Sequence, residues 1–195
     1  MFFPTRRIQN SIGIKGSTFV SFLICAKDFR ASLEEIKGNH RKADHFVIAR
    51  RFMDEQWQVR ESFSDDGEPR GTSGMPTLKV MQGYDLIECG ILTVRYFGGT
   101  LLGTGGLSRA YTKAAQEVIE VAKRNNALEV YNPRHLKSYF VAFSQVGQIE
   151  NLCHKLEIEI VRSDFEERGM AIDILATRDL LEQFDREWAS LQHKA

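Results

Sequence analysis

The sequence predicts an α+β protein of two domains, on three observations. Runs rich in aromatic and β-branched residues predict strands in the first two thirds of the chain, the clearest at residues 18–25 (TFVSFLIC). An apolar stripe at helical spacing predicts a long helix at residues 107–125. From residue 137 the pattern changes to strand, helix, strand, strand, helix, which is most of a ferredoxin-like unit.

The first domain is predicted as residues 1–130, and its elements follow from periodicity and flanking residues. Strands are expected at residues 18–25, 46–52, 56–63 and 90–97, and helices at 28–36, 76–82 and 107–125. Asp28 and Thr104 are expected to cap the first and last of these helices. Pro76 is expected in the first turn of the middle helix, where its missing N–H is tolerated.

The second domain is predicted as residues 131–195, from a boundary that is bracketed by Asn125-Asn126 and Asn132-Pro133. Strands are expected at residues 137–143, 157–165 and 170–177, and helices at 146–156 and 178–191. The sequence shows no fourth strand of the kind that normally closes a ferredoxin-like sheet.

Composition restricts the class of protein. The 195 residues include 26 basic and 26 acidic side chains, so charge alone does not attract the chain to nucleic acid or to a membrane. Up to Asn125 basic residues are in excess by four, and beyond it acidic residues are in excess by four. Three widely spaced cysteines, Cys25, Cys89 and Cys153, are typical of buried free thiols in a reducing compartment. With no signal peptide and no membrane-spanning run, the expectation is a cytoplasmic protein.

A loop at residues 64–76 gathers three carboxylates, Asp65, Asp66 and Glu68, in four positions. Such a cluster is able to bind a hard cation, but its spacing does not match the calcium-loop pattern. The more common role of Asp-Gly followed by Pro is a stiffened turn. No metal site is therefore predicted.

A second loop, at residues 98–106, runs from a predicted strand into the long helix. Gly98, Gly99, Gly103, Thr104, Gly105 and Gly106 lie in it, between Arg95 and Arg109. Free N–H groups at such a junction are able to bind an anion. Both the P-loop and the dinucleotide fingerprint fail, however, and glycine equally serves close backbone packing.

Other candidate sites have weaker support. His45, with His40 and Asp44, lacks a zinc-binding spacing. A Ser/His/Asp assembly from Ser73, His45 and Asp65 or Asp66 lacks the nucleophile-elbow pattern. The basic stretch comprises Arg41, Lys42, Arg50 and Arg51, together with Arg6 and Arg7. It suits an RNA surface or, more simply, a solvated charged edge.

The two loops resemble the motifs of the IMPACT family, in its two-domain YigZ-like bacterial branch. The first motif is Asp65-Asp66-Gly67-Glu68-Pro69-x-Gly71-Thr72-x-Gly74-x-Pro76. The second is Arg95-Tyr96-Phe97-Gly98-Gly99-x-x-Leu102-Gly103-Thr104-Gly105-Gly106-Leu107-x-Arg109-Ala110-Tyr111. Lys15-Gly16-Ser17-Thr18-Phe19 and Ala43-Asp44-His45 resemble two weaker motifs. Two positions differ from the family, because Ser73 replaces the usual Ala and Thr18 the usual Arg.

The resemblance implies a first domain similar to the second domain of small-subunit ribosomal protein five, an α/β sandwich. It implies a second domain similar to a ferredoxin-like domain of elongation factor G. Eukaryotic relatives bind a co-activator of the amino-acid-starvation kinase, so the resemblance implies a link to translation. It carries over no catalytic residue.

The expected function is therefore a non-catalytic, translation-associated regulatory protein that binds the ribosome, RNA or a protein partner of the translation machinery. No cofactor, metal or membrane partner is expected. The binding surface is expected to include His45, Asp65, Asp66, Glu68, Arg95, Arg109 and the glycine-rich loop. The alternatives are a phosphate- or nucleotide-binding protein, or an enzyme, that uses the two loops, and a protein-interaction scaffold without RNA.

Overall fold

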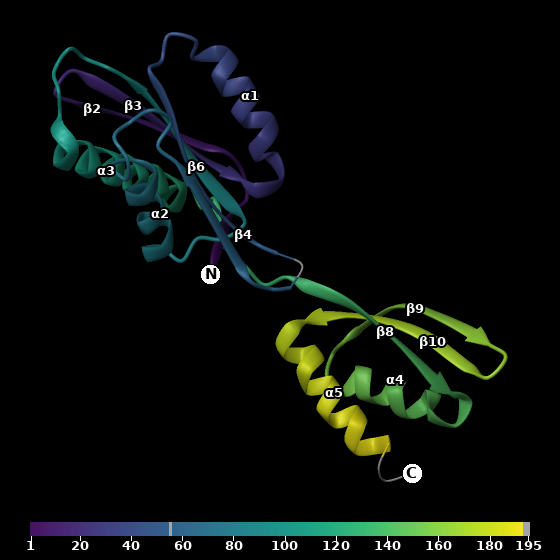
Figure 1. The fold of residues 1–195 in the computed structure, drawn as a ribbon. Helices are drawn as coiled ribbons and strands as arrows, with labels where there is room; N and C mark the ends of the chain where they lie inside the picture. Colours follow the sequence, from purple (N-terminus) through teal and green to yellow (C-terminus); the bar gives the residue numbers. More distant parts are fainter. Residues whose placement is uncertain (55, 193–195) are drawn as a thin grey trace. The chain divides into compact units, whose positions relative to one another are not determined.

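The structure is a computed structural model that describes residues 1–54 and 56–192. The chain divides into two units, Met1–Tyr131 and Asn132–Ala195, each with its own sheet and core (Figure 1). The chain is mixed α+β, as the sequence predicts.

The first unit is built on a five-stranded antiparallel sheet in the order β2-β3-β6-β4-β5. Its strands are β2 (Ile8–Ile14), β3 (Ser17–Cys25), β4 (His45–Met53), β5 (Val59–Ser64) and β6 (Cys89–Tyr96). A separate two-stranded sheet pairs β1 (Phe2–Pro4) with β7 (Leu128–Val130).

Helices pack on both faces of the five-stranded sheet (Figure 1). A 3₁₀ turn (Ala26–Asp28) leads into α1 (Phe29–Asn39), which packs on one face, and α2 (Gly74–Gly83) and α3 (Gly103–Arg124) pack on the other. Coverage of both faces explains why β3 is almost continuously apolar. Its Phe22 faces α1, while Phe19 and Leu23 face the pair of helices.

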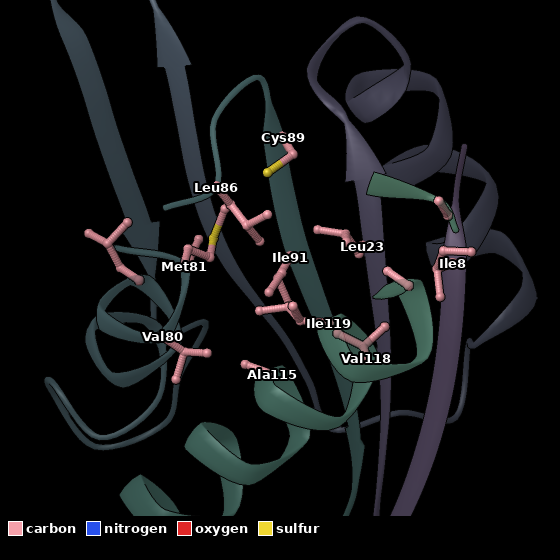
Figure 2. Packing of buried hydrophobic residues seen from close by; sticks show 14 residues of the cluster. Ile8, Leu23, Val80, Met81, Leu86, Cys89, Ile91, Ala115, Val118 and Ile119 are labelled. Atoms are coloured by element: carbon pink, nitrogen blue, oxygen red, sulfur yellow. The ribbon is translucent and has the colours of Figure 1, made fainter. Parts of the chain in front are cut away.

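A cluster of buried apolar side chains fills the space between the sheet and the α2–α3 pair (Figure 2). Leu23 and Ile91 project from the sheet toward Met81 of α2 and Ile119 of α3, and all four are fully buried. The stripe on α3 predicted from its sequence periodicity supplies one wall of this core. Nearer the start of α3, Leu107, Ala110, Tyr111 and Ala114 pack in a second cluster with Phe19 and Val47 of the sheet.

The sequence pattern did not predict three of the strands, β1, β2 and β7. In β2 the polar residues Gln9, Asn10 and Ser11 hide the strand pattern, although Ile8, Ile12 and Ile14 keep the alternation. The two predicted helix caps, Asp28 and Thr104, were wrong. Asp28 occupies the N-cap position of α1 but makes no capping bond, and Thr104 lies inside α3, whose N-cap position is Leu102.

The second unit has the predicted βαββα order. Its elements are β8 (Arg134–Ala142), a 3₁₀ turn (Phe143–Gln145), α4 (Val146–Lys155), β9 (Glu159–Glu166), β10 (Gly169–Thr177) and α5 (Arg178–Gln192). The antiparallel sheet has the order β8-β10-β9, the ferredoxin-like arrangement for these three strands. Both helices pack on one face, around the fully buried Phe184.

Within the described part of the chain, no helix has the length and apolar character needed to cross a membrane.

Candidate functional site

The sheet topology brings both predicted loops to the same end of the five-stranded sheet. β5 and β6 are each antiparallel to β4, so they run in the same direction and finish at the same end of the sheet. β4 begins at this end, with His45 opposite Arg95, and β3 begins there with Ser17. The loop after β5 (residues 65–73) and the loop after β6 (residues 97–102) therefore emerge side by side, and α3 follows the second loop.

A buried ion pair joins the first loop to the end of β6, from which the second loop emerges. Arg95 Nη1 donates to Glu68 Oε1 at 2.7 Å, and Tyr111 of α3 donates its hydroxyl to the same oxygen at 2.8 Å. The side chains of Glu68 and Arg95 are only 2% and 6% exposed. Burial and the neighbouring Glu68 carboxylate both raise the pKa of Tyr111, so the phenol stays protonated and remains a donor. Because both charges are desolvated, each depends on the other.

His45 connects this pair to the turn of the first loop. Its Nδ1 donates to the backbone carbonyl of Asp66 at 2.8 Å, because a carbonyl is only an acceptor. Its Nε2 lies 4.0 Å from Oε2 of Glu68. The imidazole is thus oriented by the loop and directed toward a buried carboxylate.

Asp65 organises the first loop through its carboxylate. Its oxygens accept hydrogen bonds from the backbone N–H groups of Gly71, Ser73 and Gly74 and from the Ser73 hydroxyl, at 2.7–3.2 Å. Burial raises the pKa of Asp65, but these hydrogen bonds outweigh burial and hold the pKa below its usual value. The carboxylate thus stabilises the chain where it enters α2.

Asp66 and Asp44 fix the strands on either side. Asp66 Oδ2 accepts from the backbone N–H of Phe46 at 2.6 Å, and Asp44 Oδ2 accepts from that of Phe97 at 2.7 Å. Asp66 and Gly67 have φ values of 44° and 84°, as in a tight turn. Among residues 1–54 and 56–192, no three His, Cys, Asp or Glu side chains form a group able to hold a metal ion.

The glycines of the second loop have different roles. Gly98 packs directly on the turn before β3: a Cβ added there would lie 1.9 Å from the carbonyl carbon of Gly16. The Gly98 N–H also donates to the Ser17 hydroxyl at 3.1 Å. Gly99 and Gly103 instead have positive φ, 81° and 68°, with open space around them. Close packing thus explains Gly98, and backbone conformation explains Gly99 and Gly103.

The start of α3 is open to solvent. Gly103, Thr104 and Gly105 are exposed, Gly106 is partly exposed, and no side chain caps the helix. Arg109 is exposed one turn further along. Ahead of the helix, Phe97 is 45% exposed and Leu101 86% exposed. This surface, made of residues 97–106 and Arg109, is named the loop-two surface.

Comparison with known proteins identifies the family. The model of the Impact N-terminal domain matches residues 15–119, which is more than half of the chain. The chain belongs to the IMPACT family. Every residue of the network between Gly16 and Tyr111 lies within the matched range.

Three similar proteins illustrate the relationship. An IMPACT family member of Haemophilus influenzae is 36% identical over 156 residues, 78% of this chain and 74% of that protein. The Escherichia coli IMPACT family member YigZ is 32% identical over 160 residues, with the same coverage of 78% and 74%. The crystal structure of a hypothetical protein covers 98% of this chain and 92% of its own, with a TM-score of 0.64 and 27% identity.

Several side chains of this IMPACT-family network were not among the predicted site residues. Tyr111 was predicted as part of the apolar stripe of α3 and as a motif position, Ser17 as a motif position, and Asp44 as a motif position beside His45. Their presence in the family motifs beside polar neighbours was the available signal.

The Ser/His/Asp assembly considered from the sequence is not formed. Ser73 is fully buried and its hydroxyl donates to Asp65, not to His45.

The basic side chains predicted as one stretch make separate contacts in the structure. Arg51 is buried against Glu61 and the Leu86 carbonyl, and Arg7 pairs with Glu35. Arg51 and Arg7 thus make separate contacts within the first unit and do not form one basic surface.

Proposed function

We propose that this IMPACT-family chain is a translation-associated regulatory protein that acts by binding and catalyses no reaction, and that its partner belongs to the ribosome. The link to translation comes from the family resemblance, which implies domains like those of a ribosomal protein and an elongation factor. One structural observation carries the binding role: the motif carboxylates are engaged by the protein's own donors.

Each acidic side chain of the first loop already has a structural role. Asp65 accepts from three backbone N–H groups, Asp66 accepts from Phe46, and Glu68 is paired with Arg95. A general base or a metal ligand needs a carboxylate that is available to a substrate or an ion. These contacts favour a rigid support over a reaction centre.

The loop-two surface is the exposed part of this end of the sheet, and it is able to contact a partner. It combines the exposed apolar side chains of Phe97 and Leu101 with the cationic Arg109 and the uncapped start of α3. The Arg95–Glu68 pair lies directly beneath it, since Arg95 packs 5.6 Å from the Phe97 ring centroid. A loop held in place loses little conformational entropy when it binds.

Co-sedimentation with ribosomes from the source bacterium tests the proposal. The native chain is expected to pellet with ribosomes at low salt and to be released as salt rises. Arg109→Glu, on the loop-two surface, should weaken the association about tenfold or more. Arg124→Glu, at the exposed far end of the same helix, is the matched control and should bind like the native chain.

Three results would contradict the proposal: no association at low salt, equal loss in both variants, or a turnover that disappears with Asp65→Asn. Purified ribosomal RNA and nuclease-treated ribosomal proteins, tested separately, identify which component is bound.

A second candidate function rests on the uncapped start of α3. Exposed N–H groups at a helix start attract anions, so a phosphate or nucleotide is the alternative ligand. A thermal-shift titration with inorganic phosphate and nucleotides tests it. A shift that is lost in Arg109→Glu supports this function, and the absence of any shift excludes it.

A further inference from the structure

The second unit leaves one regular strand edge without a neighbour. In the order β8-β10-β9, β8 forms one edge of the sheet, and within residues 132–192 no strand pairs on its outer side. Nine consecutive residues of β8 pair with β10 in unbroken register. In a complete ferredoxin-like sheet, an antiparallel strand occupies this position.

β8 also carries apolar side chains on the face opposite the helices. Leu136 is 61% exposed and Phe140 is 55% exposed, and both lie on the side of the strand opposite the buried Val141. An exposed regular edge with apolar side chains is a template for pairing with another strand.

We propose that β8 pairs antiparallel with β8 of a second copy of this chain, about a two-fold axis at Ser138. The two three-stranded sheets then form one six-stranded sheet with all four helices on the same face. The second copy's strand occupies the position of the missing fourth strand.

The strand is complementary to itself in this register. With Ser138 opposite Ser138, Leu136 of each copy lies opposite Phe140 of the other, so the exposed apolar residues cover one another. Isologous contacts of this kind close after two copies. The pairing uses the whole length of the strand, from Arg134 to Ala142.

The charges of β8 also favour antiparallel self-pairing. Its basic residues, Arg134, His135 and Lys137, all lie in the first half, and the second half is uncharged. Antiparallel pairing in the register centred on Ser138 therefore places no like charges opposite each other, whereas in-register parallel pairing would place Arg134 opposite Arg134. Lys137 of one copy would lie opposite Tyr139 of the other, whose hydroxyl donates to the Asp185 carboxylate at 2.6 Å.

The other sheet edge is less suited to pairing. The register between β9 and β10 shifts at Asp173/Ile174, which interrupts the regular strand. β9 also carries charges of both signs along its length, at Glu159, Arg162, Asp164 and Glu166. Both features are ways in which proteins protect an edge from pairing.

Cysteine cross-linking of the full chain tests the axis. Residues directly opposite in an antiparallel pair have Cβ atoms roughly 4.5–5.5 Å apart, near the range that a disulfide needs. Ser138→Cys should therefore form a disulfide-linked dimer under mild oxidation. Ser163→Cys, an exposed serine on β9, is the matched control and should form no disulfide-linked dimer. Cys25, Cys89 and Cys153 are buried and do not compete.

Sedimentation of the unlinked chain gives an independent measurement. The native chain should show a concentration-dependent dimer, and Leu136→Asp should weaken the dimerisation about tenfold or more. Phe165→Asp, which changes a 71% exposed side chain on β9, should leave it unchanged. A native chain that stays monomeric, or Ser163→Cys linking as readily as Ser138→Cys, would overturn the proposal.

Discussion

The first unit buries an ion pair that has no buried counterpart among residues 132–192. The Glu68–Arg95 pair joins a loop to β6 and contacts α3 through Tyr111, with side chains 2% and 6% exposed. In the second unit the ion pairs among residues 132–192 join side chains that are at least 30% exposed. Removing one member of a buried pair leaves a charge without solvent or partner, whereas a surface pair is replaced by water.

This difference separates two ways of making a surface. At the end of the sheet in the first unit, buried polar side chains bind to one another and hold the two loops in place. The loop-two surface is exposed on top of these contacts. In the second unit the core lies on one side of the sheet, and within residues 132–192 no helix covers the other side and no strand pairs with the outer edge of β8. The first unit uses polar side chains to fix its loops, and the second has backbone groups on the outer side of β8 that no strand of that unit pairs with.

The largest expected effect tests the buried pair. Glu68→Ala should lower the free energy of unfolding of the first unit by about 3–5 kcal/mol, because Arg95 remains buried without a counter-ion. Urea denaturation followed by circular dichroism measures it. Glu182→Ala in the second unit removes an exposed pair with Arg178 and should cost about 0.5 kcal/mol or less.

The double variant Glu68→Met with Arg95→Met tests whether the lost stability comes from the charge that is left unpaired. Replacing both charges by apolar side chains of similar size should recover much of the lost stability. If Glu68→Ala costs no more than Glu182→Ala, the contrast between buried and exposed pairs is wrong.

An intermediate effect is expected from the carboxylate that organises the first loop. Asp65→Asn should cost about 1.5–3 kcal/mol at neutral pH, because the hydrogen bonds from Gly71, Ser73 and Gly74 lose a charged acceptor. Asp28→Asn is the matched control, since Asp28 makes no capping bond at the start of α1, and it should change stability little.

The same variant should also alter the dependence of stability on pH. The folded-state pKa of Asp65 is lowered, so its contribution is present above the unfolded value of about 3.9 and is lost as pH falls through the folded value. The difference between native chain and Asp65→Asn should therefore shrink below about pH 4. A difference that stays constant from neutral to acid pH would contradict the carboxylate's role.

The sequence was sufficient for the elements whose pattern is local. The stripe of α3 and the order of the second unit follow from periodicity, and both agree with the structure. The Glu68–Arg95 contact joins residues 27 positions apart and depends on β4 lying between β5 and β6. Periodicity contains no information about strand order, so it could not establish that the two loops lie side by side.

Side-chain roles within an element were harder to predict for a related reason. Tyr111 fits the apolar stripe by its ring, while its hydroxyl serves the ion pair. Thr104 has the residue type of a helix cap, but the glycines around it allow α3 to begin earlier, at Gly103. In each case a tertiary contact or backbone conformation decides what the residue type alone leaves open.

The smallest expected effect tests the free face of the second unit. Phe140→Ser should change the free energy of unfolding by about 0.5 kcal/mol or less in a solution dilute enough for the chain to be monomeric, because the ring is 55% exposed. Phe184→Ala, on the covered face of the same unit, should cost about 3–5 kcal/mol, because it leaves a cavity in the core. Chemical denaturation of both variants at the same concentration measures the difference. Equal losses would mean that Phe140 is part of the core, and the two faces of this sheet would then not differ as the structure indicates.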